Sequence, residues 1–428
     1  MTAEADRAVD HLFRHYAGQM VAALARAVGA DRIDLAEEVV QDALVRALDV
    51  WRYRGVPDDP RGWLYRVAHH RALDLLRRDV TLRQKLPLLP PPAAFDASDA
   101  SAGPPFADDE LALVFLCCHP ALTPDSRVAL TLRIAGAFSV EEIGAALLTE
   151  PGAIAQRIVR AKRALREHGV DLALPGSGDA LKRLDSVLVC LYLLFTEGYD
   201  AHAGDEAVRE DLCFEAIRLG EALAAHPATD TPAVRALLAL MYLQASRLRA
   251  RCEDGELVLL DEQDRGRWDA RLVAAGMRHL DASACGEELT SYHVEAAIAA
   301  AFASGDPDWP GILGLYDQLL ALSPTPVVRL NRAVALGKVN GPDAALRELV
   351  PLLEFPAMRR YHLLPALLGR FYGESGRRAQ AAEAYRAALR LPCNAAERRF
   401  IEGKLRALES AAAPFELRGG ASPMEAAS

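Results

Sequence analysis

The sequence has few aromatic residues and few cysteines. Aromatic side chains make up 6% of the 428 residues, and the seven cysteines lie scattered along the chain. Such cysteine usage excludes a disulfide scaffold and fits a reduced cytosol. The best apolar run, residues 187–195, falls well short of the ~20 residues that a membrane-crossing helix needs. The acidic, polar start MTAEADRAVD predicts no secretory signal. We therefore expect a cytoplasmic protein without a membrane segment.

Motifs of catalysis and metal binding are also missing. The chain contains no P-loop, no nucleophile elbow and no HExxH sequence. Cys117, Cys118 and His119 have no second Cys/His pair at ligand spacing, whereas zinc needs four ligands. The acidic cluster at 261–264 lacks the central glycine of a calcium loop. We expect Cys117, Cys118 and His119 to be buried at a helix end, and we expect no metal, no cofactor and no enzymatic activity.

The residues that are abundant favour helices. Hydrophobic residues make up 51% of the chain, and alanine, leucine and arginine, all strong helix formers, dominate. We therefore predict an all-α protein of two to four domains. Prolines and changes in pattern divide it into six parts. These are a helical segment (8–85), a proline-rich linker (86–107), a second helical segment (108–172), a longer helical region (180–290), a repeat region (291–410) and a disordered tail (411–428).

Charge is distributed unevenly along the chain. The formal net charge is -10, of which -2 falls in residues 1–170 and -8 in the remainder. Residues 151–166 carry five basic side chains and no acidic one. Because salt screens charges beyond ~8 Å, such a local patch matters more for contact with phosphates than the total does. The net acidity therefore does not exclude nucleic-acid binding.

The strongest local pattern is that of a helix-turn-helix. Ser139 and Glu142 have the spacing of a capping box, and Pro151 suits the first turn of a second helix. In that second helix the apolar residues share one face, and basic and amide residues share the other: Ile154, Ile158, Ala161 and Leu165 against Gln156, Arg157, Arg160 and Arg163. Arginine suits guanine and glutamine suits adenine in a major groove. An ordinary amphipathic surface helix is the competing interpretation.

A second pattern lies upstream, in PDDPRGWLYRVAHHRALDLLRR. The apolar residues Leu64, Ala68, Ala72 and Leu75 predict a buried stripe. On the opposite face an aromatic ring stands among basic residues, as a single-stranded DNA surface requires: Trp63, Arg66, His70 and Arg77. Taken alone, Trp63 is better explained as a core residue. In the preceding helix, 34–53, an outward face carries Glu38, Gln41 and Asp42, which suits a basic partner helix or simply solvent.

Together these segments resemble an RNA polymerase sigma factor of the sigma-70 family, of the extracytoplasmic-function (ECF) type. AEEVVQDALVRALDVW resembles the part of region 2 that grips the clamp helices of the β′ subunit. DPRGWLYRVAHHRALDLLRR resembles the part that opens and reads the −10 element. LTPDSRVALTLRIAGAFSVEEIGAALLTEPGAIAQRIVRAKRALR resembles region 4, which reads the −35 element. Three ordered segments are far more specific than one short motif.

The resemblance implies partners and site residues. The partners are core RNA polymerase, through its β′ clamp helices and β flap, and promoter DNA. Polymerase contact is implied for four residues: Glu38, Gln41, Asp42 and Arg46. Contact with the −10 element is implied for Trp63, Arg66, His70 and Arg77, and contact with the −35 element for Thr149, Gly152, Gln156, Arg157, Arg160, Lys162 and Arg163. His70 stands where relatives often have asparagine, so base preference there stays open, and Asp42 stands where glutamate is common.

The rest of the chain resembles a subclass in which a helical, tetratricopeptide-like extension follows the sigma core. LYLLFTEGYDAH, GELVLLDEQDRGRWD and SPTPVVRLNRAVALGKVNGP belong to this resemblance. Three columns of residues recur at spacings of 33 and 36: Ala300, Ala333 and Gly369; Ile312, Ala345 and Ala381; Tyr316, Leu349 and Tyr385. A tetratricopeptide unit has ~34 residues, and stacked units make a concave protein-binding surface. An irregular helical bundle is the alternative.

Three functions follow as hypotheses. The first is a promoter-specificity subunit whose acidic extension restrains DNA binding and receives a signal from a protein partner. The second is a helix-turn-helix activator or scaffold that works without replacing another sigma factor. The third is an enzyme, which the missing acid, base and nucleophile set disfavours. Transcription that depends on this chain as the sole sigma subunit distinguishes the first from the second.

Overall fold

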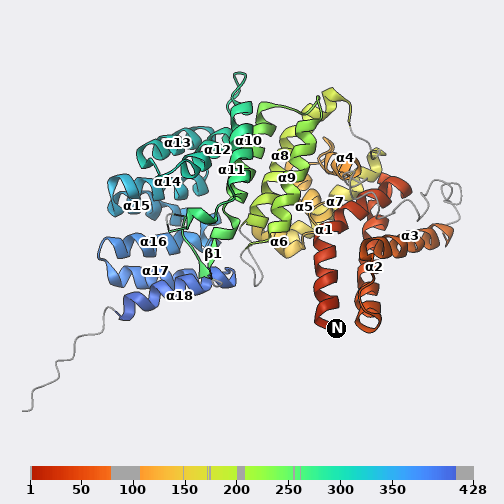
Figure 1. Ribbon diagram of the computed structural model, residues 1–428, viewed down its shortest axis with the longest axis horizontal. Coiled ribbons are helices and arrows are strands. Elements are labelled where there is room, and N and C mark those ends of the chain that lie inside the picture. The colour runs from red at the N-terminus through yellow and green to blue at the C-terminus, as the bar shows by residue number, and fades with distance from the viewer. Residues whose placement is uncertain are drawn as a thin grey trace, which may run out of the picture. The chain divides into compact units, whose positions relative to one another are not determined.

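The computed structural model describes residues 2–78, 107–147, 149–170, 172, 175–199, 208–253, 256–260 and 262–410. Residues 86–106 of the predicted linker and the predicted tail 411–428 lie outside these ranges. The chain divides into two compact units, Met1–Pro324 and Thr325–Ser428, which are described separately below. The described residues are helical apart from one short hairpin, so the predicted all-α fold is confirmed (Figure 1).

The first three helices are α1 (Thr2–Val28), α2 (Ile33–Arg54) and α3 (Pro60–Arg78), with the 3-10 turn η1 (Ala30–Arg32) between α1 and α2. The apolar face of α2 is buried as predicted, and Trp51 is 1% exposed. In α3, Leu64, Ala68 and Ala72 are fully buried, but Leu76 completes the stripe, and the predicted Leu75 is only partly buried. The strict four-residue step of a helix face explains this difference, since Leu76 follows Ala72 by four positions.

The next four helices are α4 (Ala107–Cys117), α5 (Pro124–Ile134), α6 (Val140–Ala146) and α7 (Pro151–His168). The predicted capping box is confirmed: the Ser139 amide donates to Glu142 Oε2 at 2.7 Å, and the Glu142 amide donates to Ser139 Oγ at 3.1 Å. Pro151 opens α7, whose four predicted apolar residues are all buried. Cys117 and Cys118 are buried at the end of α4, as predicted, while His119 is half-buried.

The remaining elements of the first unit are α8 (Ser177–Tyr199), α9 (Glu210–Ala225), α10 (Pro232–Ala245), α11 (Ala270–Ser283), α12 (Ser291–Ala303) and α13 (Trp309–Leu322). Between α10 and α11 the chain forms η6 (Leu248–Ala250), the hairpin β1 (Cys252–Glu253) and β2 (Glu256–Leu257), and η7 (Arg265–Arg267). Figure 1 shows α8 and α9 packed side by side, and α10 and α11 do the same.

One continuous apolar core runs through the first unit, from Val9 in α1 to Ala296 in α12. Helix α1 packs against α4 and α9, and α5 packs against α8. The sequence predicts two separate helical modules at the front of the chain, but in the structure their apolar surfaces share this core with the helices that follow. The reason is that α4, α5 and α8 are apolar on more than one face, which a single small module cannot cover.

The second unit contains α14 (Pro326–Asn340), α15 (Pro342–Leu349), η8 (Val350–Glu354), η9 (Pro356–Arg360), α16 (Leu363–Glu374), α17 (Arg378–Leu389) and α18 (Ala395–Ser410). Consecutive helices stack on one another, as Figure 1 shows. The small residues of the predicted columns lie where helices approach closely. A Cβ at Gly369 would lie 2.8 Å from the Tyr385 ring, and Ala333 and Ala381 are fully buried.

None of the helices in the described part of the chain is long and apolar enough to span a bilayer. All seven cysteines are free thiols.

A buried carboxyl group in α12 makes the stability of the first unit depend on pH. Burial raises the pKa of Glu295 to about 7, although Tyr192 Oη donates a hydrogen bond to it at 3.1 Å. Because the folded chain holds this proton more tightly than the unfolded chain, the stability that Glu295 contributes is full below pH ~4.5 and is lost as the pH rises towards ~7.

We expect the Glu295→Gln variant to gain unfolding free energy over the wild type as the pH rises from 5 to 8, by about 1–3 kcal/mol. The glutamine amide still accepts a hydrogen bond but carries no charge. Urea unfolding at pH 5, 6, 7 and 8 measures this, with the exposed Glu288→Gln as a control. A difference between Glu295→Gln and wild type that stays constant with pH contradicts the expectation.

Candidate nucleic-acid interface

Helix α7 presents a polar face to solvent. Gln156, Arg160 and Arg163 are exposed, opposite the buried apolar stripe. Arg160 Nη2 donates to Gln156 Oε1 at 3.3 Å, and Arg163 Nε donates to Glu167 Oε1 at 2.7 Å. Both contacts are exposed and local, so they hold the side chains only weakly. The face can therefore exchange these contacts for base edges and phosphates.

The turn between α6 and α7 fixes the angle at which that face is presented. A Cβ at Gly144 would lie 2.8 Å from the carbonyl oxygen of Thr149, so this close approach requires glycine. The Thr149 hydroxyl donates to the Leu147 carbonyl at 3.0 Å, and the residue is half-buried. A Cβ at Gly152 would meet no atom within 4 Å, so the first turn of α7 is open to solvent.

Two of the residues predicted to face the −35 element have ion-pair partners on other helices. Arg157, which is 31% exposed, lies 3.5 Å from Asp125. Lys162 turns towards α2, and its Nζ lies 2.8 Å from Asp34 Oδ1 and 2.6 Å from Glu37 Oε2. Its side chain is only 14% exposed. Lys162 is therefore not part of the exposed face in this arrangement.

Lys162 belongs to an ion-pair cluster between α2 and the α5–α7 helices, which we call the clasp: Asp34, Glu37, Arg133, Lys162 and Arg166. Arg133 Nε lies 3.0 Å from Glu37 Oε1, and Arg166 Nη1 lies 3.5 Å from Asp34 Oδ2. Burial alone would lower the pKa of Lys162, but Glu37 and Asp34 more than offset it and the pKa is raised. The cluster holds Lys162 firmly in its charged form.

Backbone packing accompanies the clasp. A Cβ at Gly18 in α1 would collide with the carbonyl oxygen of Ala135 at the end of α5, so these helices are in direct contact. Arg26 of α1 forms an ion pair with Asp109 of α4. In this state, the first three helices and the helix-turn-helix are fixed to each other.

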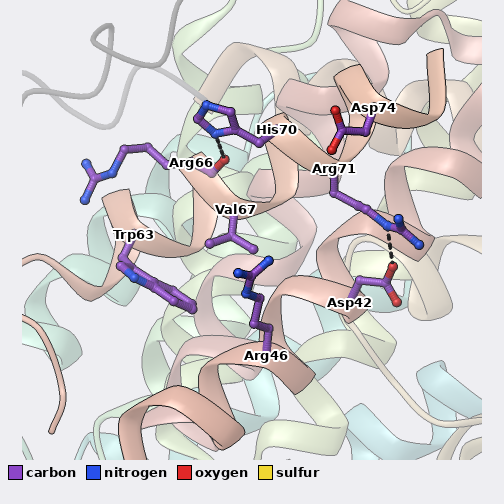
Figure 2. A pocket seen from close by; sticks show the side chains of 8 residues that line it. All are labelled: Asp42, Arg46, Trp63, Arg66, Val67, His70, Arg71 and Asp74. Carbon is purple, nitrogen blue, oxygen red and sulfur yellow. Dashed lines mark hydrogen bonds and ion pairs between the residues drawn. The ribbon is translucent and has the colours of Figure 1, made fainter. Parts of the chain in front are cut away.

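A pocket of about 560 Å³ lies between α2 and α3, and its volume is in the range of small-ligand sites. It brings together two residues predicted for polymerase contact, Asp42 and Arg46, and three predicted for the −10 element, Trp63, Arg66 and His70. Val67, Arg71 and Asp74 complete its lining. Figure 2 shows Arg46 between Trp63 and Asp42, with the Arg66 side chain extending away from the others. The pocket thus offers one indole ring among several cations.

Contacts within and below the pocket orient its side chains. The half-buried Trp63 ring packs edge-on against the buried Trp51 ring, with centroids 5.3 Å apart. His70 Nδ1 lies 2.7 Å from the Arg66 carbonyl oxygen, and Arg71 Nε donates to Asp42 Oδ2 at 3.0 Å. Trp63 is therefore partly a core residue and partly a wall of the pocket, and its role in DNA binding stays a prediction.

The other predicted residues of these helices lie as follows. Glu38 and Gln41 are exposed on α2 outside the pocket, and Gln41 donates to Glu37 at 3.3 Å. Arg77 lies in the last turn of α3. The structure adds Val67, Arg71 and Asp74, which the sequence analysis did not single out. These residues follow Trp63 along α3 in steps of three and four residues. That spacing places them on the same face of the helix and could have predicted them from the sequence.

The helix-turn-helix is also joined to the helices that follow it. Arg209 Nη1 lies 3.0 Å from Glu142 Oε1 of the capping box. Arg218 of α9 forms ion pairs with Glu110 of α4 and with Glu215. Burial and the neighbouring Glu215 raise the pKa of Glu110, against the opposing effect of Arg218. Nothing in the sequence pattern signalled these long-range pairs. Within the described ranges, no three or more His, Cys, Asp or Glu residues are grouped to hold a metal ion.

Comparison with known proteins identifies three parts of the chain. Residues 12–80 match Sigma-70 region 2, and residues 112–165 match Sigma-70, region 4. Residues 183–284 match a family of unknown function (DUF6596). No solved structure matches the chain.

Two relatives frame these matches. An uncharacterized protein of Rhizobium meliloti (strain 1021) is 37% identical over 405 residues, which cover 90% of this chain and 94% of that protein. The ECF RNA polymerase sigma factor SigE of Mycolicibacterium smegmatis is 29% identical over 163 residues, covering 37% of this chain and 60% of that protein. The chain therefore belongs to the same family as the Rhizobium protein, and its own Sigma-70 regions 2 and 4, which are domains of a non-enzymatic family, precede a domain of unknown function.

Proposed function

We propose that this protein is a sigma factor that binds core RNA polymerase, captures the −10 element with region 2 and reads the −35 element with region 4. The observation that carries the proposal is the presence, in one chain, of an exposed Gln156–Arg160–Arg163 face on the second helix of a helix-turn-helix and of the Trp63 pocket in region 2.

The α7 face supports major-groove recognition. Gln156 and Arg160 are one helical turn apart and bond to each other, so they reach neighbouring base pairs. Arg157 and Arg163 lie next to them on α7 and supply positive charge for phosphate contacts. Gly152 leaves room for the DNA backbone at the start of α7.

The region 2 pocket supports capture of an unpaired base. The exposed side of Trp63 offers a stacking surface, while Arg46, Arg66 and His70 surround it with donors for phosphate and base edges. Glu38 and Gln41 continue the polar face of α2 beyond the pocket, and with Asp42 they suit a basic helix of the polymerase. Arg77 follows His70 by seven residues along α3.

The C-terminal helices suit a regulatory, protein-binding role of tetratricopeptide type. Supporting this, the helix pairs α14–α15 and α16–α17 repeat the same small and large residues at the same places, and Leu349 and Tyr385 are both buried. A cavity of about 360 Å³ lined by Leu336, Asn340, Ala344, Arg347 and Glu348 offers a groove for a peptide. Stacked helix pairs of this kind bind partners on a concave face.

Run-off transcription with purified core RNA polymerase and a pool of genomic promoters tests the proposal. We expect specific transcripts when this chain is the only sigma subunit present. Binding of an operator by the protein alone, with transcription only after another sigma factor is added, would instead identify a helix-turn-helix activator.

Replacing Arg160 by alanine should weaken binding of the −35 duplex by the holoenzyme ~10-fold to 100-fold, because a two-point arginine–guanine contact contributes ~1–3 kcal/mol. Preference at one base pair should relax as well. Anisotropy titrations with single-base variants of the duplex measure both effects. Arg406→Ala, an exposed arginine of α18, is the matched control. Equal affinity of Arg160→Ala and Arg406→Ala for every duplex refutes the assignment of α7.

A further inference from the structure

The connection between α10 and α11 is long and internally structured. It runs from 246 to 269, and the Asp269 amide donates to the Ser246 carbonyl at 2.8 Å to close its base. Within it, the Val258 amide donates to the Arg251 carbonyl at 2.8 Å, and Gln263 Nε2 donates to the Val258 carbonyl at 3.1 Å. Connections longer than ~12–15 residues are uncommon in compact domains and usually serve a function.

A cavity of about 570 Å³ opens beside this connection, lined by Arg249, Gly266, Arg267, Trp268 and Asp269. Its volume is in the range of sites for small organic ligands. Two guanidinium groups and one indole ring line it, and a single carboxylate accompanies them. Its lining residues come from η6, from η7 and from the residues just before α11, all within the first unit.

The two cavity arginines are available for a ligand. Arg249 is exposed, and none of the residues that the structure describes pairs with it. Arg267 lies 3.6 Å from Glu253, whose side chain is 68% exposed, and such a surface pair is weak. The one carboxylate, Asp269, already accepts the amide of Arg271 at 2.8 Å and that of Leu272 at 3.3 Å as the N-cap of α11.

Two nearby arginines have structural contacts instead. Arg251 lies 3.8 Å from the centre of the Tyr199 ring. Arg265 lies 5.6 Å from the Trp268 ring and donates to the Gly305 carbonyl. Through Arg265 the Trp268 ring is held in place as a wall of the cavity. Among the described residues, the exposed Arg267–Glu253 pair is thus the one ion pair that Arg249 and Arg267 make between them.

We propose that this cavity is a binding site for a small organic anion, whose phosphate or carboxylate groups are clamped by Arg249 and Arg267 and whose body rests against Trp268. Guanidinium groups match such oxyanions with two parallel hydrogen bonds. The site gives the domain of unknown function a chemical ligand of its own. No lining residue belongs to region 2 or region 4, so the site is independent of promoter recognition.

Calorimetric titration of the full chain with two probes, inorganic pyrophosphate and citrate, at constant ionic strength tests the site. We expect at least one probe to bind saturably, and the two arms show whether phosphate or carboxylate chemistry is preferred. Arg249→Gln and Arg267→Gln should each weaken that binding at least ~10-fold, as loss of a charge-assisted contact predicts. Arg271→Gln, exposed on α11 and outside the cavity, removes the same charge and should bind as the wild type does.

All three replaced side chains are exposed, so we expect the variants to fold as the wild type does. Circular dichroism checks this. Absence of saturable binding for both probes overturns the proposal. So does equal binding by wild type, Arg249→Gln and Arg267→Gln. If neither probe binds and the two variants instead lose affinity for promoter DNA, the arginines are a DNA contact and the proposal is wrong.

Discussion

Replacing Trp63 by leucine is expected to lower open-complex formation by the holoenzyme ~10-fold or more, because stacking of one unpaired base on an aromatic ring contributes ~1–3 kcal/mol. Leucine keeps an apolar side chain against Trp51, so the core of region 2 is retained. Trp63→Phe keeps a ring and should restore most of the activity. Permanganate reactivity of unpaired thymines, together with run-off transcription, measures the effect.

Two further measurements separate polymerase binding from promoter melting and so show which step depends on Trp63. Assembly of Trp63→Leu with core polymerase and its binding to a pre-melted promoter fork should show which step is lost. We expect assembly to be unchanged and fork binding to fall with open-complex formation. Wild-type levels of open complex from Trp63→Leu would remove the Trp63 pocket from the promoter-binding surface.

Opening the clasp should raise the affinity of the free protein for promoter DNA about tenfold. The −10 and −35 elements are ~25 base pairs apart, or ~85 Å along B-DNA at ~3.4 Å per base pair. In the structure Lys162 of region 4 lies 2.6 Å from Glu37 of region 2, so both DNA surfaces cannot reach their elements at once.

Glu37→Gln is the variant that tests the clasp, because it removes the carboxylate shared by Lys162 and Arg133 without adding positive charge. Loss of this carboxylate weakens the closed arrangement, and a shift of ~1.4 kcal/mol towards the open one gives the expected tenfold change. Glu38→Gln, the exposed neighbour with no contact to region 4, is the control. Anisotropy with a −35 duplex measures affinity, and small-angle scattering measures expansion. Identical affinity and radius for the two variants would show that the clasp does not restrain the free protein.

The clasp also bears on the idea that the acidic extension restrains DNA binding. Deleting residues 180–428 would expose the apolar faces of α4 and α5 that pack in the continuous core, so the deletion changes folding as well as charge. Point changes at Glu37 separate the two effects. The Lys162–Glu37 ion pair joins regions 2 and 4, while Glu110–Arg218 and Glu142–Arg209 join the region 4 helices to those that follow.

Local patterns in the sequence were enough to predict the elements and many exposed side chains. The capping box at Ser139, the proline that opens α7 and the four-residue apolar step of α7 each depend only on neighbours along one helix. The same holds for the exposed Gln156 and Arg160. Such features are decided by helix geometry and by hydrogen bonds over three or four residues, which the sequence displays directly.

Contacts between distant residues needed the tertiary structure. Lys162 has the spacing of an outward-facing residue of α7, yet Asp34 and Glu37 hold it in the clasp. Glu37 and Lys162 are 125 residues apart in the sequence. Likewise, Asp42 and Trp63 belong to different helices but line one pocket. Arg249 and Trp268 are 19 residues apart in the connection between α10 and α11 and line one cavity. The sequence by itself determined the helices and which faces of them are polar. Only the packing of apolar surfaces decided which polar faces meet, because that choice depends on shape and charge matching between elements that no periodicity along the chain records.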